Sequence, residues 1–545
     1  MSASSKNDTN ETAYDVVPYQ SWPFAQSHPD RLAVMAKLFG LDPTRIDQSR
    51  VLELGCAAGG NLLPLAQTYS ASQFVGIDLS ARELCDGQQT LDQLSLSNIE
   101  LRQANILDVD ASFGTFDYII AHGVFSWIPT EVQEHVFRLC KALLRPHGVA
   151  YISFNTYPGW HMRGMIRSML TYHTRQFSEP REQIEQARGL LKFLSHSVPT
   201  EGNPYGAYLQ QELEWCEQSD DSYLYHDLLA GINEPTLFHE FVDRAESHGL
   251  QYLSECDLAS MASCNFNKDV DETLQRLSQD LIQIEQYMDF LRNRTFRQTL
   301  LCHREHALDR TLNPKYCRTL HFASPLAPES SSVDLAEGVV ERFAASGIAV
   351  NSSNPMIKAA HVLMSRAWPV WIPFDQLTHE AMRLASIDPT DEPQRQRRSM
   401  QLGEHLIRCF ASRAVVVHSA PPTFETVLND RPAVTDLTRY QAKTLGYVTN
   451  QKHEVVQLDA FCRCIAERLD GTRTTSQLTN EIHEMISNGQ LRYTDHGDDS
   501  AQSRSQLNEL PLDKTSREVQ WALDQIRSVF LLVASFRNSS SSSPN

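Results

Sequence analysis

The stretch from Val51 to Asn61, with the sequence VLELGCAAGGN, constrains the fold of this chain more than any other. It begins with a short apolar run, passes the acidic Glu53 and ends in small residues. This pattern is typical of a buried parallel strand followed by a tight loop and a helix. Glycines let backbone N–H groups face the crevice at the carboxyl end of such a strand. We therefore expect a ligand at this loop, near the N-terminus of a helix that begins at about Leu62.

Two classes of cofactor fit this loop. As a dinucleotide fingerprint starting at Gly55 it is degraded, because Ala57 stands where a glycine normally lets the backbone approach a pyrophosphate. Read from Glu53, the acid and the small residues after it resemble the first motif of class I S-adenosylmethionine-dependent methyltransferases, here Gly55, Cys56, Ala57 and Gly59. S-adenosylmethionine carries a sulfonium and an ammonium, for which an acid is a suitable partner. Glu53 therefore favours the methyl donor, and a strand-turn-helix without any ligand is the remaining alternative.

Two further apolar segments end in polar residues that belong at the same edge of a parallel sheet. Residues 73–78 end in Asp78, roughly 20 residues beyond the glycine loop, where such folds use a carboxylate to hold ribose hydroxyls. Residues 116–121 lead into His122. We expect Asp78 to bind the ribose and His122 to lie beside the bound donor.

A third strand candidate, residues 99–104, leads into Asn105. In methyltransferases the residue at this place usually contacts the adenine amino group. The resemblance therefore assigns Asn105 and its neighbour Ile106 to the adenine, with Asp108 as the alternative contact.

Strand and helix candidates alternate through five strands, which predicts a parallel, doubly wound, Rossmann-like α/β sheet. A helix at about 130–144 precedes the fifth strand at 149–154. Such a sheet still needs a helix and two strands, which we expect at 235–248, at 249–254 and, antiparallel, at 296–302. Residues 166 to about 231 would then form a helical insertion above the crevice, and 270–291 a further long helix.

Composition excludes several classes of protein. The chain has 545 residues, enough for two or three domains, and a formal net charge of -19, which disfavours nucleic acid as a partner. No run approaches the roughly 18 apolar residues of a membrane span, so we expect a soluble, cytoplasmic protein without a membrane partner. The 11 cysteines include no CxxC pair, and His303 and His306 lack a third ligand, so reduced core thiols and no metal site are expected.

Several motifs extend the resemblance beyond the methyltransferase superfamily. Residues 19–29, 122–129 (HGVFSWIP) and 155–160 (NTYPGW) together look like bacterial methyltransferases that carry a methyltransferase regulatory domain. That family includes the rickettsial protein-lysine methyltransferases. The similarity continues through 225–229, 238–241, 453–454 and 469–471. It implies S-adenosylmethionine as the cofactor, a protein as the substrate and a mostly helical, winged-helix-like domain near the C-terminus.

We expect six segments along the chain. They are a disordered N-terminus (1–13), an S-adenosylmethionine-binding core (14–165), a helical insertion and regulatory segment that completes the sheet (166–305), a middle or linker domain (306–425), a winged-helix-like domain (426–537) and a disordered tail (538–545). The arm at 14–29 is either a lid over the donor or simple packing on the sheet. The acidic balance favours protein docking or homodimerisation over DNA binding for the C-terminal domain. Residues 1–305 should fold and bind the donor alone.

Methyl transfer is an in-line displacement at a sulfonium carbon, so the protein chiefly aligns the two reactants and excludes water. His122 is a candidate for a general base or an acceptor-orienting group, and the alternative is that it holds its loop in place. Tyr157 and Trp160 follow the fifth strand and are candidates for the walls of a channel, because aromatic faces suit an alkyl-ammonium acceptor.

Three functions remain open at this point. The first is a methyltransferase that acts on lysine side chains of proteins, which the C-terminal domain recruits. The second is a small-molecule O- or N-methyltransferase with accessory domains for gating or dimerisation, and the third is a non-catalytic donor-binding protein. Intact Glu53, Gly55 and Asp78 speak against the third, and the large accessory part favours the first over the second.

Overall fold

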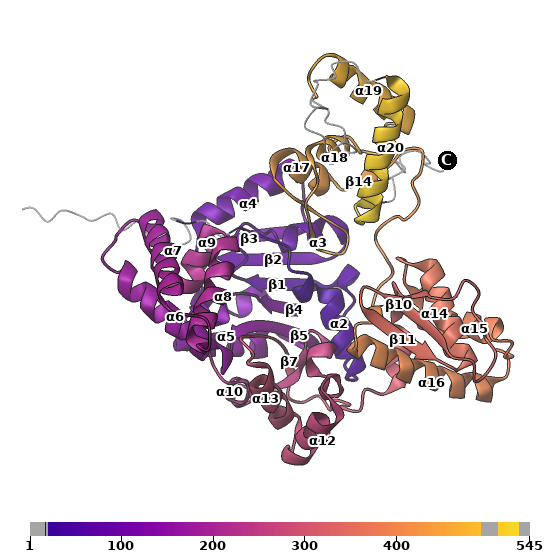
Figure 1. Cartoon of the computed structure of the whole chain (residues 1–545), viewed down its shortest axis with the longest axis horizontal. Helices are drawn as coiled ribbons and strands as arrows, with labels where there is room; N and C mark the ends of the chain where they lie inside the picture. Colours follow the sequence, from indigo (N-terminus) through magenta and orange to yellow (C-terminus); the bar gives the residue numbers. More distant parts are fainter. Residues whose placement is uncertain (1–16, 18–19, 492–510, 534–545) are drawn as a thin grey trace, which may run out of the picture.

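A seven-stranded sheet organises the first 305 residues of the computed structural model, which describes residues 17, 20–491 and 511–533 (Figure 1). The predicted disordered ends, 1–13 and 538–545, lie outside the described residues. The strands are β1 (Arg50–Leu54), β2 (Gln73–Asp78), β3 (Ile99–Gln103), β4 (Phe116–Ala121), β5 (Leu144–Asn155), β6 (Leu250–Glu255) and β7 (Phe296–His303).

The strand order is β3-β2-β1-β4-β5-β7-β6, with β1 to β5 parallel and β7 antiparallel to both of its neighbours. Every residue of β4 is buried, because helices cover both faces of the sheet. Central strands of this kind are continuous apolar runs rather than alternating ones. The predicted doubly wound α/β sheet is confirmed, and β6 and β7 lie at the expected places of the sixth and seventh strands.

Helices pack on both faces of this sheet. One face contacts α2 (Pro29–Leu38), α3 (Leu62–Thr68) and α4 (Ala81–Leu94), and the other contacts α5 (Thr130–Leu143) and α10 (Phe238–Ser247). The prediction of one long helix at 270–291 is wrong, because α12 (Lys268–Leu277) and α13 (Leu281–Arg292) are separate. Asp280 accepts a hydrogen bond from the backbone N–H of Gln283, and this cap starts the second helix.

The guanidinium of Arg297 in β7 fastens the last two strands to α13. It is fully buried and pairs with Glu255 of β6 at 2.8 Å, and with Glu285 and Asp289 of α13 at 3.2 and 2.8 Å. Charges are tolerated in a protein interior where they are paired and hydrogen-bonded. This ion cluster therefore holds β6, α13 and β7, the elements after the insertion, together in the sheet.

The helical insertion has a small core of its own. It comprises α6 (Gly159–Thr174), α7 (Pro180–Ser197), α8 (Pro204–Gln218), α9 (Asp221–Leu224) and a π-helix (Tyr225–Leu229). The short α11 (Leu258–Met261) follows β6. The π-helix returns the chain to the carboxyl ends of the strands, where its side chains join those of the sheet loops.

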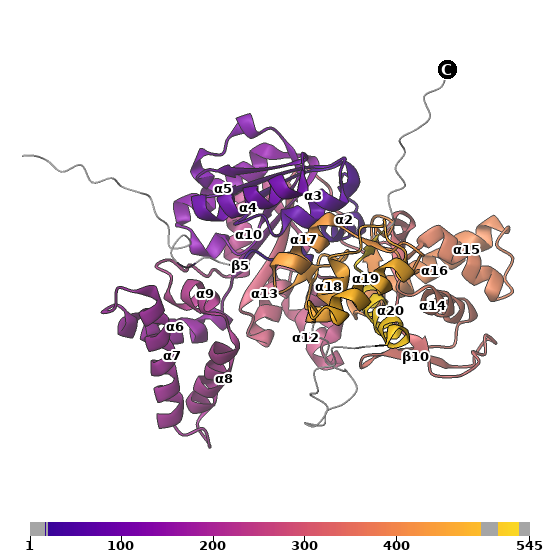
Figure 2. The ribbon, with the colours of Figure 1, turned by 90° about the horizontal axis from the view of Figure 1, so that it is seen from above.

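Residues 306–425 form a compact α/β unit at the opposite end of the molecule from α6–α8 (Figures 1 and 2). Its helices are α14 (Pro355–Ala367), α15 (Phe374–Leu384) and α16 (Glu392–Ala411), and its two small sheets are formed by β8 (His321–Ala323), β9 (Ala327–Pro328), β10 (Glu341–Ala345), β11 (Ile348–Ser352), β12 (Ile372–Pro373) and β13 (Val416–His418). Asp30 of α2 accepts hydrogen bonds from the backbone N–H and the hydroxyl of Ser419, at 2.8 and 2.5 Å. The predicted middle or linker domain therefore shares a continuous core with α2.

The C-terminal unit packs beside α3 and α4 (Figure 1). It contains α17 (Asp436–Thr444), α18 (Ala460–Ala466), α19 (Thr475–Ser487), α20 (Leu512–Ser528), and the paired strands β14 (Ala433–Val434) with β17 (Leu532–Val533) and β15 (Val448–Thr449) with β16 (Val455–Val456). The β-hairpin of β15 and β16 connects α17 to α18. Among the described residues, every helix is too short or too polar to cross a bilayer.

Candidate active site

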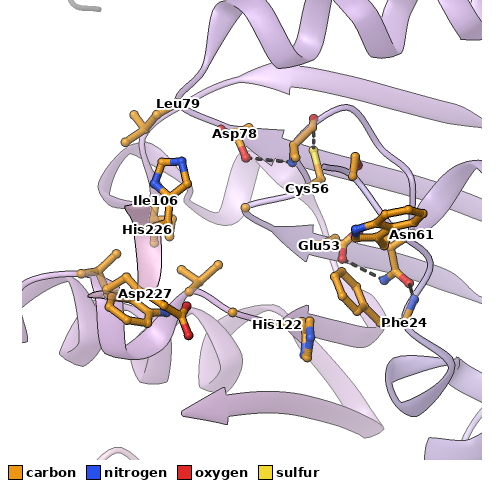
Figure 3. A pocket seen from close by; sticks show the side chains of 18 of the residues that line it. Phe24, Glu53, Cys56, Asn61, Asp78, Leu79, Ile106, His122, His226 and Asp227 are labelled. Atoms are coloured by element: carbon orange, nitrogen blue, oxygen red, sulfur yellow. Dashed lines mark hydrogen bonds between the residues drawn. The ribbon is translucent and has the colours of Figure 1, made fainter. Parts of the chain in front are cut away.

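A cavity of about 790 Å³ lies at the carboxyl ends of the central strands (Figure 3). Loops after β1 to β4 form one side, and residues 20–26, the end of β5, the helices of the insertion and the start of β7 line the other sides. The predicted site residues that line it are Glu53, Gly55, Cys56, Ala57, Asp78, Asn105, Ile106, His122 and Trp160. Two predicted residues, Gly59 and Tyr157, are not among its lining residues.

Close contacts fix the glycine loop after β1. Gly55 has a φ of +75°, and a Cβ at this position would lie 2.5 Å from Cγ2 of Val124. Its N–H donates to the carbonyl of Ile77 in β2. Ala57 has a φ of 47°, a left-handed conformation that residues with a Cβ seldom adopt, and its N–H donates to Asp78. The loop is therefore held in one conformation at the cavity.

Glu53, near the end of β1, is a buried acid, and only one of its two carboxylate oxygens has a hydrogen-bond partner among the described residues. Its Oε1 accepts a hydrogen bond from Nδ2 of Asn61 at 2.8 Å, whereas Oε2 is buried and has no hydrogen-bond partner among the described residues. Burial raises the pKa of Glu53 to about 8; the bond from Asn61 opposes this rise and the charge of Asp78 adds to it. A cation beside Oε2 would favour the charged form. These residues therefore fit a donor that carries a sulfonium and an ammonium.

Asp78 and Asn105 both line the cavity and both hold backbone in place. The two oxygens of Asp78 accept hydrogen bonds from the N–H groups of Ala57 and Ser80, each at 2.9 Å. Asn105 caps a short 3-10 helix after β3, and Ile106 begins that helix. Ribose binding by Asp78 and adenine binding by Asn105 stay predictions. The structure shows that Asp78 also holds the glycine loop in place, through its hydrogen bond from Ala57.

His122 follows β4 and is enclosed by aromatic side chains. Its Nδ1 lies 2.9 Å from the hydroxyl of Tyr151, and its ring centroid lies 4.1 Å from that of Phe24. Burial lowers the pKa of His122 to about 4, so the ring is neutral at pH 7 and is a weak base. This geometry favours orienting an acceptor or holding the loop over a role as general base.

The insertion lines its side of the cavity with the aromatic rings of Trp160 and Tyr223, and with Arg163, His226 and Asp227. The ring centroids of Trp160 and Trp127 lie 6.1 Å apart. Asp227 in the π-helix lies 4.0 Å from Nη1 of Arg163, and burial raises the pKa of Asp227 to about 6 although Arg163 opposes the rise. Sequence reasoning missed Asp227, although residues 225–229 carry part of the family resemblance and were the available signal.

Tyr157 and Gly59 contribute to neighbouring structure instead. The ring of Tyr157 stacks on that of His161 at 4.1 Å, and it lines a second cavity of about 570 Å³, which also includes Trp160. A Cβ on Gly59 would lie 3.3 Å from Leu101, so this glycine allows the loop to pack on β3. Tyr157 therefore does not line the larger cavity, where we expected it to form a wall of the acceptor channel.

The N-terminal arm covers the cavity rather than the flank of the sheet. The backbone N–H of Phe24 donates to Oδ1 of Asn61 at 2.9 Å, and the N–H of Gly60 donates to the hydroxyl of Ser21 at 2.8 Å. Of the two interpretations of the arm, the lid agrees with these contacts. Sequence reasoning also missed Asn61, although its position directly after the glycine loop is a signal that could have identified it.

Three family models match the chain. The one described as a methyltransferase domain matches residues 51–148, and the predicted methyltransferase regulatory domain matches 220–303. The one described as the C-terminal winged helix domain of PKMT matches 430–515. The second match overlaps the π-helix and the last two strands of the sheet, so the segment that supplies Asp227 and Arg297 is a recurrent part of such proteins.

Whole-chain comparisons agree with these matches. An uncharacterised protein of Rickettsia prowazekii is 35% identical over 494 residues, which cover 89% of this chain and 88% of that protein. Another protein of that organism is 39% identical over 245 residues, which cover 45% of this chain and 98% of that protein. The solved structure of PKMT2 from Rickettsia typhi in complex with AdoHcy is 30% identical and has a TM-score of 0.81, over 95% of this chain and 100% of that one.

Proposed function

The chain belongs to the family of S-adenosylmethionine-dependent methyltransferases with a methyltransferase regulatory domain and a PKMT-type winged-helix domain, and on that premise we propose that it methylates lysine side chains of proteins. When bound, S-adenosylmethionine would supply the electrophilic methyl group for the acceptor nitrogen. The name of the Rickettsia typhi relative denotes a protein-lysine methyltransferase, and this supports the proposed acceptor.

The observation that carries the proposal is the position of Asp227 in the same cavity as the donor loop (Figure 3). The rings of Trp127, Trp160 and Phe296 line that cavity as well. A lysine ammonium is attracted by a carboxylate and by the faces of aromatic rings. Because Asp227 belongs to the insertion and Glu53 to the sheet, separate parts of the chain would recognise acceptor and donor.

The chemistry requires that the lysine loses a proton before it attacks. Although burial raises the pKa of Asp227 to about 6, this value is still below 7, so most of its carboxylate is charged at pH 7. It attracts the ammonium and offers the leaving proton a first acceptor, from which solvent removes it. Desolvation by the aromatic rings lowers the pKa of the lysine itself. The neutral ring of His122, held by Tyr151, would then orient the acceptor rather than take up its proton.

The charge distribution also supports a basic protein partner. Residues 306–545 are close to charge-balanced, so most of the net charge of -19 lies on the first 305 residues, where the cavity is. An acidic approach attracts lysine-rich segments. The C-terminal units then serve to hold the protein substrate, for which a donor cavity alone offers little surface.

A labelling experiment tests the proposal. The full chain is incubated with methyl-labelled S-adenosylmethionine and a total cell lysate, and the protein fraction is hydrolysed in acid. We expect the label in methylated lysine, and none when the lysines of the lysate proteins are acetylated beforehand. Label confined to small molecules, or undiminished label on the acetylated proteins, would overturn the lysine assignment.

A further inference from the structure

Two histidines and a cysteine converge between two helices of the middle unit, far from the donor cavity. His361 belongs to α14, and His405 and Cys409 lie four residues apart on one face of α16. The Nε2 atoms of the two histidines are 2.9 Å apart, and Sγ of Cys409 lies 3.3 Å from Nε2 of His405. One potential ligand atom from each residue lies within 4.8 Å of the other two.

We propose that His361, His405 and Cys409 bind one borderline-soft divalent metal ion of the zinc class. With Zn–N bonds of about 2.0–2.1 Å and Zn–S bonds of about 2.3 Å, tetrahedral coordination places two nitrogens roughly 3.3 Å apart and nitrogen and sulfur roughly 3.6 Å apart. The two observed separations are a few tenths of an ångström shorter, and the third pair, His361 and Cys409, lies within 4.8 Å. A rearrangement of the three side chains would therefore convert the cluster into a coordination site.

Hydrogen bonds alone satisfy this cluster poorly. When Nε2 of His361 carries a proton and donates it to Nε2 of His405, the single lone pair of that nitrogen is occupied. The thiol of Cys409 then cannot donate to the same nitrogen. When Nε2 of His405 carries the proton instead, His361 must hold its own on Nδ1, which is buried and has no partner among the described residues. A metal ion would avoid this conflict, because the two histidine nitrogens and the cysteine sulfur can all donate an electron pair to the same ion.

The protonation states suit this chemistry. Burial lowers the pKa of His361 to about 3 and that of His405 to about 4, so both rings are neutral and have a lone pair at pH 7. Burial raises the pKa of Cys409 to about 12, so the thiol releases its proton to solvent as the metal–sulfur bond forms. Imidazole and thiolate ligands select zinc-like ions over magnesium and calcium.

The surroundings give the ion a rigid site with one open position. The ring of Phe343 stacks on that of His361 with centroids 5.1 Å apart, and His361 is fully buried. His405 is half-buried, which leaves a side from which the ion and a water ligand enter. Because α14 and α16 belong to the unit that packs on α2, the ion would join two helices of that unit and leave the donor site unchanged.

Cobalt titration of the metal-stripped full chain tests the inference. Cobalt bound to a cysteine thiolate gives a near-ultraviolet charge-transfer band, so we expect this band to saturate at one equivalent and to disappear when zinc is added. Cys409→Ser should abolish the band. Cys317→Ser is the matched control, because Cys317 is a buried cysteine of the same unit outside the cluster, and it should leave the band intact.

His405→Gln is a second variant, at a partly exposed position that tolerates the change. It should lower the cobalt affinity at least ten-fold, while binding of S-adenosylhomocysteine stays unchanged and verifies the fold. The wild-type thermal midpoint should rise with zinc, and that of Cys409→Ser should not. Absence of the band in the wild-type chain, or its persistence in Cys409→Ser, overturns the metal site.

Discussion

Nε2 of His453 lies 2.7 Å from Oδ1 of Asn61, so the hairpin loop between β15 and β16 touches the residue that follows the glycine loop. The two residues are 392 positions apart in the sequence, and both are buried. Asn61 in turn donates to Glu53. The C-terminal unit therefore supports the donor side of the cavity through Asn61, and residues 1–305 alone would lack this contact.

His453→Ala should weaken binding of S-adenosylhomocysteine. The substitution removes one of the hydrogen bonds that fix the amide of Asn61, worth about 1 kcal/mol or roughly five-fold in affinity. Calorimetric titration of the full chain measures the effect. His483→Ala, in the same unit but bonded to Thr515, is the control and should bind as wild type. Equal affinities in the two variants would contradict the coupling between the C-terminal unit and the donor loop.

Asp78→Ala should weaken donor binding more strongly. The side chain is predicted to hold the ribose, and it also accepts the N–H of Ala57, so the variant loses both the ligand contact and a fixed loop. We expect a loss of roughly 1.5–3 kcal/mol, the range for hydrogen bonds to a charged group. Asp86→Ala, on the exposed side of α4, is the matched control. Unchanged affinity in a folded Asp78→Ala variant would mean that the ribose lies elsewhere.

Donor binding near pH 7 should release a proton from Glu53. Its pKa is raised to about 8, so most Glu53 side chains are protonated in the free protein at pH 7. A cationic donor favours the carboxylate, and the affinity therefore rises with pH until Glu53 is ionised. Calorimetry in two buffers of different ionisation enthalpy counts the proton. The count should fall toward zero in Glu53→Gln, and an equal count in both proteins would refute the assignment.

The donor half of the site could be predicted from the sequence because strand ends are a local signal. Glu53, Asp78 and His122 each follow an apolar run, and parallel strands bring their carboxyl ends together whatever the loops do. Asp227 and His453 do not follow a strand in this way. Tertiary packing brings Asp227 from the insertion to the cavity and brings His453 from the C-terminal unit to Asn61, which lines the cavity. The spacing of apolar residues along the sequence predicts which face of a helix is buried, but it does not indicate which distant loop packs on that face.

Arg297→Ala should destabilise the protein markedly. Removing the guanidinium leaves the carboxylates of Glu255, Glu285 and Asp289 buried without their main counter-charge. Breaking a buried ion pair in this way costs about 3–5 kcal/mol. Urea unfolding followed by circular dichroism measures the loss. Arg304→Ala, at an exposed position just after β7, should change the unfolding midpoint little. Similar midpoints for the two variants would mean that the cluster does not hold the last strands.

Methylation of a lysine-rich peptide should become faster between about pH 7 and pH 9, because only the neutral amine attacks the methyl group. The charge of Asp227 stabilises the bound ammonium and so raises the pKa of the bound lysine relative to a cavity without that charge. In Asp227→Asn we therefore expect a higher KM for the peptide and a kcat–pH profile whose rise is shifted toward lower pH. A purely structural role would lower activity without moving the profile. Asp243→Asn, at an exposed position of α10, is the control and should keep the wild-type profile. If the profile of Asp227→Asn coincides with that of wild type, Asp227 does not face the acceptor nitrogen.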